Sequence, residues 1–137
     1  VEDLKGCRWL DGSGYDPKWV YHGLIVGSAS DACRFIHAVG TGQFVTDKSY
    51  ARMITPFELG GAIAGRPWVR AAYGLGVMNG DFVTLGPVFG HSGNGPGSVA
   101  AVYCIKGAAV CAFAGDDEEY DVEWETQRMA LDLRKGS

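Results

Sequence analysis

A regular alternation of apolar and polar positions begins after residue 28. Four apolar residues recur at helical spacing and share one face. They are Ala32, Phe35, Ile36 and Val39. Ser28 and Asp31 have the spacing of a capping box at the start of this segment. In a capping box the side chain of each residue accepts a hydrogen bond from the backbone N–H of the other. Gly40 and Gly42 follow the last apolar position, so the pattern predicts a helix over about 29–39.

A second, shorter helix is predicted directly afterwards. Thr46 has the side chain of a helix N-cap, and three larger side chains then share one side of the helix. They are Tyr50, Met53 and Ile54. Pro56 ends this helix because the residue before a proline is pushed out of the helical region. Residues 57–71 contain several glycines and a proline, and they are predicted to form a surface loop.

From Tyr73 onward, the residue types and their pattern are typical of strands. Residues 73–78 form a candidate strand, Asn79-Gly80 a hairpin turn and residues 82–85 the returning strand. Residues 99–105 and 109–114 are nearly continuous apolar runs. Such runs are typical of strands that are covered on both faces.

The turn between these two apolar runs determines which cysteines face each other across the hairpin. A two-residue turn at Gly107-Ala108 places Cys104 opposite Cys111, and a disulfide across one hairpin is the less common outcome for such a pair. The four cysteines, which include Cys7 and Cys33, show neither C-x-x-C nor histidine-spaced pairing. No metal site is therefore expected.

The last element is a helix over about 122–134. One face carries its apolar side chains: Val122, Met129, Ala130 and Leu133. The acidic run 116–119 precedes the helix and basic residues lie toward its end, in the order that complements the helix dipole. This run is interpreted as a solvent-exposed segment that leads into the helix, rather than as a metal site.

The order of elements predicts an α+β fold with an antiparallel sheet packed against at least the last helix. We expect one domain throughout 1–137. It consists of an irregular entry at 1–27, two helices in 28–56, antiparallel strands in 73–115 and a C-terminal helix at 121–135.

Composition excludes several classes of function. The 137 residues are 47% hydrophobic and 20% charged, as in ordinary globular domains. The net charge of −4 provides no electrostatic footprint for nucleic acid. The longest apolar stretch, 98–115, is interrupted by Lys106-Gly107, so no membrane segment is expected. The chain begins at Val1 without a signal-peptide pattern, which favours a piece of a longer protein.

Candidate chemistry is concentrated in residues 90–97, which read G-H-S-G-N-G-P-G. His91 is a proton carrier near neutral pH and Ser92 supplies a hydroxyl, on backbone that can approach a ligand closely. A phosphate cradle is disfavoured because a strand follows the glycines, where such loops need a helix. A self-contained His91–Ser92 nucleophilic pair is disfavoured because neighbours on an extended chain face opposite sides. A glycine-rich turn with incidental polar residues is the remaining structural alternative.

The other two histidines are weaker candidates for a functional site. His22 lies in an aromatic-rich segment and His37 lies inside the first helix. Both are interpreted as ordinary, partly buried residues rather than as ligands.

Three segments, in order, resemble the serine β-lactamase and penicillin-binding protein family, which includes D-alanyl-D-alanine carboxypeptidases, class C β-lactamases and related esterases. Residues 23–35, G-L-I-V-G-S-A-S-D-A-C-R-F, resemble a helix entrance of that family. Residues 73–77, Y-G-L-G-V, are similar to its Y-G-L-G-W strand. Residues 90–97 resemble its G-H-x-G-x-x-P-G segment. The resemblance covers about 19–116 and implies the C-terminal part of a β-lactamase/transpeptidase-like fold.

The resemblance also implies roles for the third segment, which edges the catalytic cleft of that family. His91 would provide positive charge or a proton near the leaving group, and Ser92 would hydrogen-bond the substrate carboxylate or carbonyl. The backbone N–H of Asn94, next after Gly93, would be one of two oxyanion donors. These residues support catalysis in that family but do not supply the nucleophile.

The motif that carries the nucleophile of the resembled family is not found in this sequence. The family's serine lies in an S-x-x-K motif, and a Tyr-x-Asn type motif completes the site. Both motifs precede the segments found here, and no serine of this chain has a lysine three residues on. The chain is therefore predicted to be the C-terminal part of a serine hydrolase and to be inert alone, because only binding and oxyanion contributions remain.

Partners follow from the same resemblance. The longer protein would take a small amide, lactam or ester substrate, without a metal or cofactor. Strands of the missing N-terminal half pair with the last strand in that family, so residues 109–114 would leave an apolar edge that invites that half or a second copy. The alternative is a non-catalytic binding or regulatory module of the same architecture, and a generic α+β domain without a site is the third interpretation.

Overall fold

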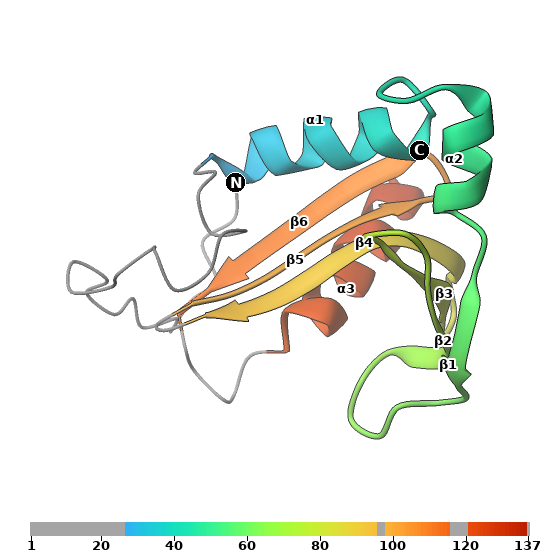
Figure 1. Ribbon diagram of the computed structural model, residues 1–137. Coiled ribbons are helices and arrows are strands. Elements are labelled where there is room, and N and C mark those ends of the chain that lie inside the picture. The colour runs from blue at the N-terminus through green and yellow to red at the C-terminus, as the bar shows by residue number, and fades with distance from the viewer. Residues whose placement is uncertain (1–26, 96–97, 116–120, 137) are drawn as a thin grey trace.

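The computed structural model describes residues 27–95, 98–115 and 121–136. Helices and strands in these residues follow one another along the chain (Figure 1). They are α1 (Ala29–Gly40), α2 (Asp47–Met53), β1 (Phe57–Gly60), β2 (Trp68–Tyr73), β3 (Met78–Phe82), β4 (Gly86–Gly95), β5 (Ser98–Ile105), β6 (Ala108–Ala114) and α3 (Val122–Lys135). The irregular entry, His22, Cys7, Pro96-Gly97 and the acidic run 116–119 lie outside the described residues.

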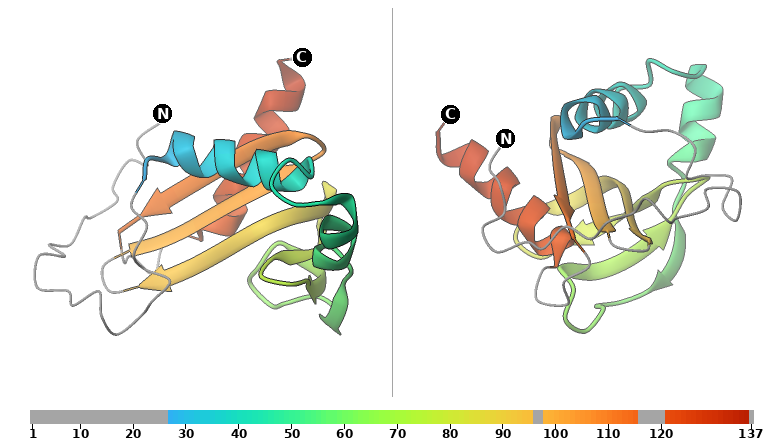
Figure 2. Two further views of the ribbon diagram at one scale, coloured as in Figure 1. Left: turned by 45° about the horizontal axis from the view of Figure 1, so that its top comes forward. Right: turned by 90° about the vertical axis from the view of Figure 1, so that its left-hand side faces the viewer.

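The strands form one antiparallel sheet whose spatial order follows the chain from β1 to β6. Helix α3 packs against β5 and β6, and α1 packs against β4, β5 and β6. The two helices lie on opposite faces of this part of the sheet (Figures 1 and 2). The α+β prediction is confirmed, together with its antiparallel sheet and C-terminal helix, and the strands at 98–105 and 108–114 are covered on both faces as expected.

The main core lies between the sheet and α3. Its largest fully buried side chains are Tyr103, Phe82 and Leu85. The ring of Phe82 meets Trp68 and Tyr103 edge to face, with centroids 4.6 and 5.0 Å apart. Burial of each such ring stabilises the fold by about 2–3 kcal/mol before conformational entropy is subtracted. On the opposite face of the sheet, Ile36 and Val39 are the buried residues of α1.

The first two helices begin where their caps predict. The Ser28 hydroxyl accepts from the Asp31 N–H at 3.2 Å, and Asp31 accepts from the Ser28 N–H at 3.1 Å, which completes the capping box. Thr46 accepts from the Ser49 N–H at 3.3 Å at the start of α2. The Tyr50 hydroxyl donates to the Gly40 carbonyl at 2.7 Å, which fixes α2 against the end of α1.

The predicted loop over 57–71 is wrong at both ends. Strand β1 occupies its start and β2 begins at Trp68, so only residues 61–67 connect the two strands. All four residues of β1 are exposed, although Phe57 pairs with Tyr73. An exposed edge strand lacks the buried alternation by which strands are recognised.

The predicted hairpin at Asn79-Gly80 is also wrong, because both residues lie inside β3. Strand β2 ends at Tyr73, and residues 74–77 make the turn. Asn79 donates from its side chain to the Ile54 carbonyl at 2.7 Å. A Cβ atom on Gly80 would lie 2.2 Å from the Arg70 carbonyl oxygen. The Asn-Gly pair therefore serves tertiary contacts rather than a turn.

The last hairpin turns one residue earlier than predicted. Lys106 and Gly107 have φ values of 50° and 85°, the positive values that a two-residue type I′ turn requires. Cys104 therefore pairs with Ala109, and the predicted opposition of Cys104 and Cys111 is wrong. Cys111 instead lies near Cys33 on α1, and burial, followed by the proximity of Cys33, raises the pKa of the Cys111 thiol to about 12.

Two further findings concern the described residues alone. No helix among them has the length and hydropathy needed to cross a bilayer. No group of three or more metal-ligating side chains is found in the same part of the chain.

Candidate functional site

The H-S-G segment lies in the second half of β4, where the strand loses one neighbour. Strand β3 begins at Met78, which pairs with Gly90, so the β3–β4 ladder ends there. Residues 91–95 continue in register with β5 alone, from His91 opposite Val102 onward. In the described chain, this stretch of β4 therefore has a free backbone edge.

Gly90 marks the point where this edge begins, and its lack of a side chain is required. A Cβ atom there would lie 2.1 Å from the Val102 carbonyl oxygen and 2.6 Å from the Tyr103 ring. Gly93 differs, because a Cβ atom on it would meet nothing within 4 Å. The first glycine thus permits β5 to approach, while the second leaves open space beside the strand.

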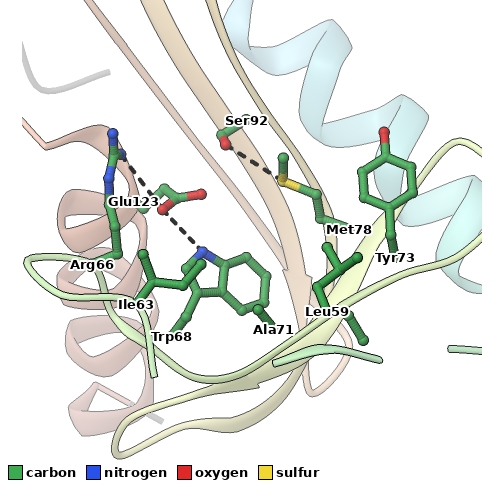
Figure 3. Close-up of a pocket in the computed structure, with 10 residues that line it drawn as sticks. Leu59, Ile63, Arg66, Trp68, Ala71, Tyr73, Met78, Ser92 and Glu123 are labelled. Carbon is green, nitrogen blue, oxygen red and sulfur yellow. Dashed lines mark hydrogen bonds and ion pairs between the residues drawn. The ribbon is translucent and has the colours of Figure 1, made fainter. Parts of the chain in front are cut away.

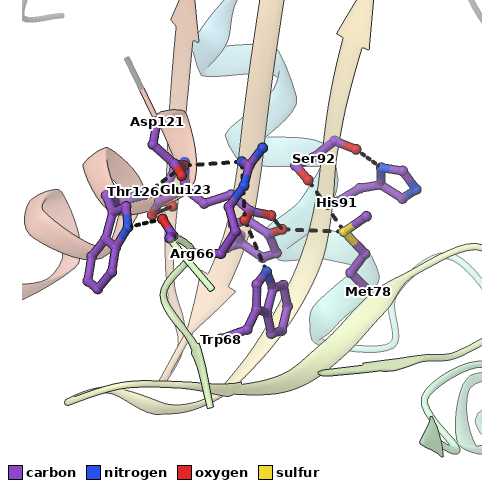
Figure 4. Close-up of polar contacts among 11 residues, drawn as sticks. Arg66, Trp68, Met78, His91, Ser92, Asp121, Glu123 and Thr126 are labelled. Atoms are coloured by element: carbon purple, nitrogen blue, oxygen red, sulfur yellow. Dashed lines mark hydrogen bonds and ion pairs between the residues drawn. The ribbon is translucent and has the colours of Figure 1, made fainter. Parts of the chain in front are cut away.

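Strand geometry sends the side chains of His91 and Ser92 to opposite faces, as expected from the sequence. Ser92 is half-buried on the face toward Tyr103 and Met78, and its hydroxyl contacts the Met78 sulfur at 3.5 Å (Figure 4). His91 is exposed. The pair therefore cannot act as nucleophile and base for each other.

His91 is held by two partners, one at each ring nitrogen. Its Nε2 atom lies 2.7 Å from the Tyr73 hydroxyl, and its Nδ1 atom lies 2.5 Å from the carbonyl oxygen of Ser92. The Tyr73 and His91 rings meet edge to face with centroids 5.8 Å apart. Two segments singled out in the sequence, Y-G-L-G and G-H-S-G, thus meet through their first polar side chains.

The Ser92 hydroxyl faces a cavity of about 210 Å³. Its walls are mainly apolar or aromatic, with Leu59, Ile63, Trp68 and Met78 among them (Figure 3). Two charged side chains, Arg66 and Glu123, complete the lining. A mostly apolar cavity with a few convergent polar groups is the usual form of a small-molecule site.

Glu123 is a buried carboxylate in the first turn of α3, with its side chain 4% exposed. It accepts from the Trp68 indole N–H at 3.0 Å and from the Tyr103 hydroxyl at 2.8 Å, and Arg66 lies 3.6 Å away (Figure 4). Burial, reinforced by the negative charge of Glu123, raises the pKa of Tyr103 well above its ordinary value. Tyr103 thus remains a hydrogen-bond donor that joins β5 to α3.

Sequence reasoning missed three of these residues. Tyr73 lay within a noted segment, but its contact with His91 depends on the correct position of the turn between β2 and β3. Glu123 lies beyond the acidic run 116–119, and no local pattern points to its partner Trp68, which is 55 positions away along the chain. Arg66 lay in the predicted loop, and no local pattern pairs it with α3.

The remaining candidates occupy less enclosed positions. Gly93 and Asn94 are exposed on β4, where Asn94 pairs with Val99. His37 is exposed on α1 rather than partly buried, and it lies on a different element from the H-S-G strand. The structure therefore places Ser92 and Tyr73 in the lining of the cavity, joins His91 to it only through Tyr73, and leaves His37 apart.

Comparison of the chain with protein-family models and with curated proteins found no match. The functional interpretation therefore rests on the site's geometry and on the motifs that compose it.

Proposed function

We propose that this chain forms one wall of the active site of a serine hydrolase of the β-lactamase, peptidase or esterase type. The nucleophilic serine would lie on a polypeptide segment outside these 137 residues. The observation that carries the proposal is the contact between Tyr73 and His91, at 2.7 Å, beside a strand edge that has no partner in the described chain. This contact joins two of the three family-like segments at one place.

The proposed chemistry is acyl transfer through a serine acyl-enzyme. The serine would attack the substrate carbonyl, the leaving group would depart with a proton, and water would hydrolyse the ester that remains. Backbone N–H groups at the free edge of residues 91–95 suit the carbonyl oxygen, on which negative charge develops. Each such donor contributes about 100- to 1,000-fold in rate in known enzymes.

Ser92 and the adjoining cavity suit the part of the substrate next to the scissile bond. The hydroxyl can donate to a carboxylate or carbonyl oxygen, since its contact with the Met78 sulfur, a weak acceptor, is readily exchanged. The apolar walls of the cavity suit a compact hydrocarbon group. A small lactam, peptide or ester substrate fits this combination.

The test compares this chain with a longer protein encoded by the same reading frame, using nitrocefin and p-nitrophenyl esters. We expect no acyl-enzyme burst from the 137-residue chain and a burst from the longer protein. In the longer protein, Ser92→Ala should lower kcat/KM by about 10- to 100-fold, because one hydrogen bond to the transition state is lost.

The proposal fails if the 137-residue chain itself shows burst acylation, or if the reading frame encodes no S-x-x-K segment. An unchanged kcat/KM in the Ser92→Ala variant would also contradict it. The control is Ser49→Ala on α2, where the hydroxyl lies 3.2 Å from Thr46 and away from β4. That variant should keep the full rate.

A further inference from the structure

The imidazole ring of His91 has no nitrogen left for a substrate. Nε2 lies 2.7 Å from the Tyr73 hydroxyl and Nδ1 lies 2.5 Å from the Ser92 carbonyl oxygen. A histidine that exchanged a proton directly with a ligand would need one of these nitrogens open. In this arrangement it would first have to give up a hydrogen bond.

The two partners determine which nitrogen of the neutral ring carries the proton. A carbonyl oxygen can only accept, so Nδ1 must be the N–H donor. Nε2 then presents its lone pair, and the Tyr73 hydroxyl donates to it. The Tyr73 oxygen keeps its own lone pairs, which remain available to a ligand.

We propose that Tyr73, rather than the His91 ring, exchanges protons with a bound substrate, and that His91 is the base behind it. A substrate-side O–H or N–H group gives its proton to the Tyr73 oxygen while the Tyr73 proton passes to Nε2. The products are the deprotonated substrate group, a neutral Tyr73 phenol and an imidazolium ring. The Nδ1–H of this ring still donates a hydrogen bond to the Ser92 carbonyl oxygen. The reverse transfer delivers the proton to a leaving group.

The surroundings place Tyr73 at the edge of the cavity, next to the place where such a substrate would bind. Tyr73 is half-buried and lines the same 210 Å³ cavity as Met78 and Ser92 (Figure 3). The edge-to-face contact with the His91 ring restrains both side chains. The identity of the proton depends on the proposed hydrolase, whereas the activation of Tyr73 by His91 does not.

The test measures the reactivity of the Tyr73 oxygen in the 137-residue chain itself. N-acetylimidazole acetylates phenols, and a base that takes the phenol proton accelerates the reaction. Tyr50 is a matched internal control, because it is also half-buried and its hydroxyl also makes a 2.7 Å bond, but to the Gly40 carbonyl, which cannot take a proton. Peptide mass spectrometry gives both rates from one sample.

We expect Tyr73 to be acetylated at least about tenfold faster than Tyr50, since general-base assistance contributes on the order of 100-fold or more in well-placed pairs. His91→Phe keeps a ring against Tyr73 but removes the base, so the Tyr73 rate should fall at least about tenfold while the Tyr50 rate is unchanged. His91→Gln, which can accept a hydrogen bond but is not a base, should behave in the same way.

Equal rates for Tyr73 and Tyr50, or a Tyr73 rate that both His91 variants leave unchanged, would overturn the proposal. In the longer protein, Tyr73→Phe should lower kcat about 100-fold with little change in KM, and an unchanged kcat would also overturn it. If no hydrolase activity exists but Tyr73 acetylation remains fast and dependent on His91, the hydrolase proposal fails and the His91-activated Tyr73 stands.

Discussion

At the scale of single residues, the chain buries one carboxylate among the residues that the structure describes, at the start of α3. Glu123 is buried, yet three donors surround it: the Trp68 indole, the Tyr103 hydroxyl and the Arg66 guanidinium. A buried carboxylate is tolerated when its oxygens are satisfied in this way. Because its partners come from a loop and two strands, Glu123 fixes the start of α3 against the sheet and one wall of the cavity.

Replacing Glu123 by Gln should therefore destabilise the protein by about 2–4 kcal/mol, because the amide cannot accept from both Trp68 and Tyr103. The matched control is Glu125→Gln on the same helix, where the carboxylate meets the partly exposed Arg128 at 2.9 Å. That pair should contribute about 1 kcal/mol or less. Urea unfolding followed by tryptophan fluorescence measures both, and equal losses would show that the Glu123 contacts are not the stabilising ones.

At the scale of elements, two of the glycines in β4, Gly90 and Gly93, occupy their positions for different physical reasons. Gly90 is needed because the backbone of β5 occupies the place of its Cβ atom, whereas Gly93 borders open space. Both read identically in the sequence, as parts of one glycine-rich motif. Only the structure separates a packing glycine from one that leaves room beside a candidate site.

Gly90→Ala should cost about 3 kcal/mol or more, because the new methyl group would force β4 and β5 apart. Gly93→Ala should change stability by less than about 1 kcal/mol and can even raise it, since alanine loses less backbone entropy on folding. Thermal unfolding of the two variants at one pH provides the comparison. A Gly90→Ala protein as stable as Gly93→Ala would contradict the close approach of the two strands.

The same contrast explains how much of the fold the sequence could predict. Helices α1 and α2 were predicted because their caps, Ser28 and Thr46, act within one turn of the chain. The turns around β3 were misplaced because Asn79 and Gly80 are used for contacts with Ile54 and Arg70, which are distant in sequence. The segment with His91 and Ser92 was singled out from its residue types, and its place on a strand was implied only by the family resemblance. Tyr73 and Glu123 join the site through pairing between residues that are distant in sequence.

At the scale of the whole molecule, the sheet ends at β6, which has β5 as its one neighbour among the described strands. A groove of about 650 Å³ runs along β6 between α1 and α3, and Cys33, Val110 and Leu133 are among the residues that line it. An apolar edge strand with unpaired backbone groups is a template for another strand. The groove therefore suits an added strand from another polypeptide segment, such as a second copy of this chain.

We expect the 137-residue chain to form dimers in a concentration-dependent manner, as measured by size-exclusion chromatography with light scattering. Phe113 lies on β6 and is 36% exposed, so Phe113→Lys should shift the equilibrium to the monomer by placing a charge where the new strand would pack. Val83, 37% exposed in the turn before β4, provides the control, and Val83→Lys should leave the dimer unchanged. A wild-type chain that remains monomeric up to about millimolar concentration would show that β6 does not recruit a second copy.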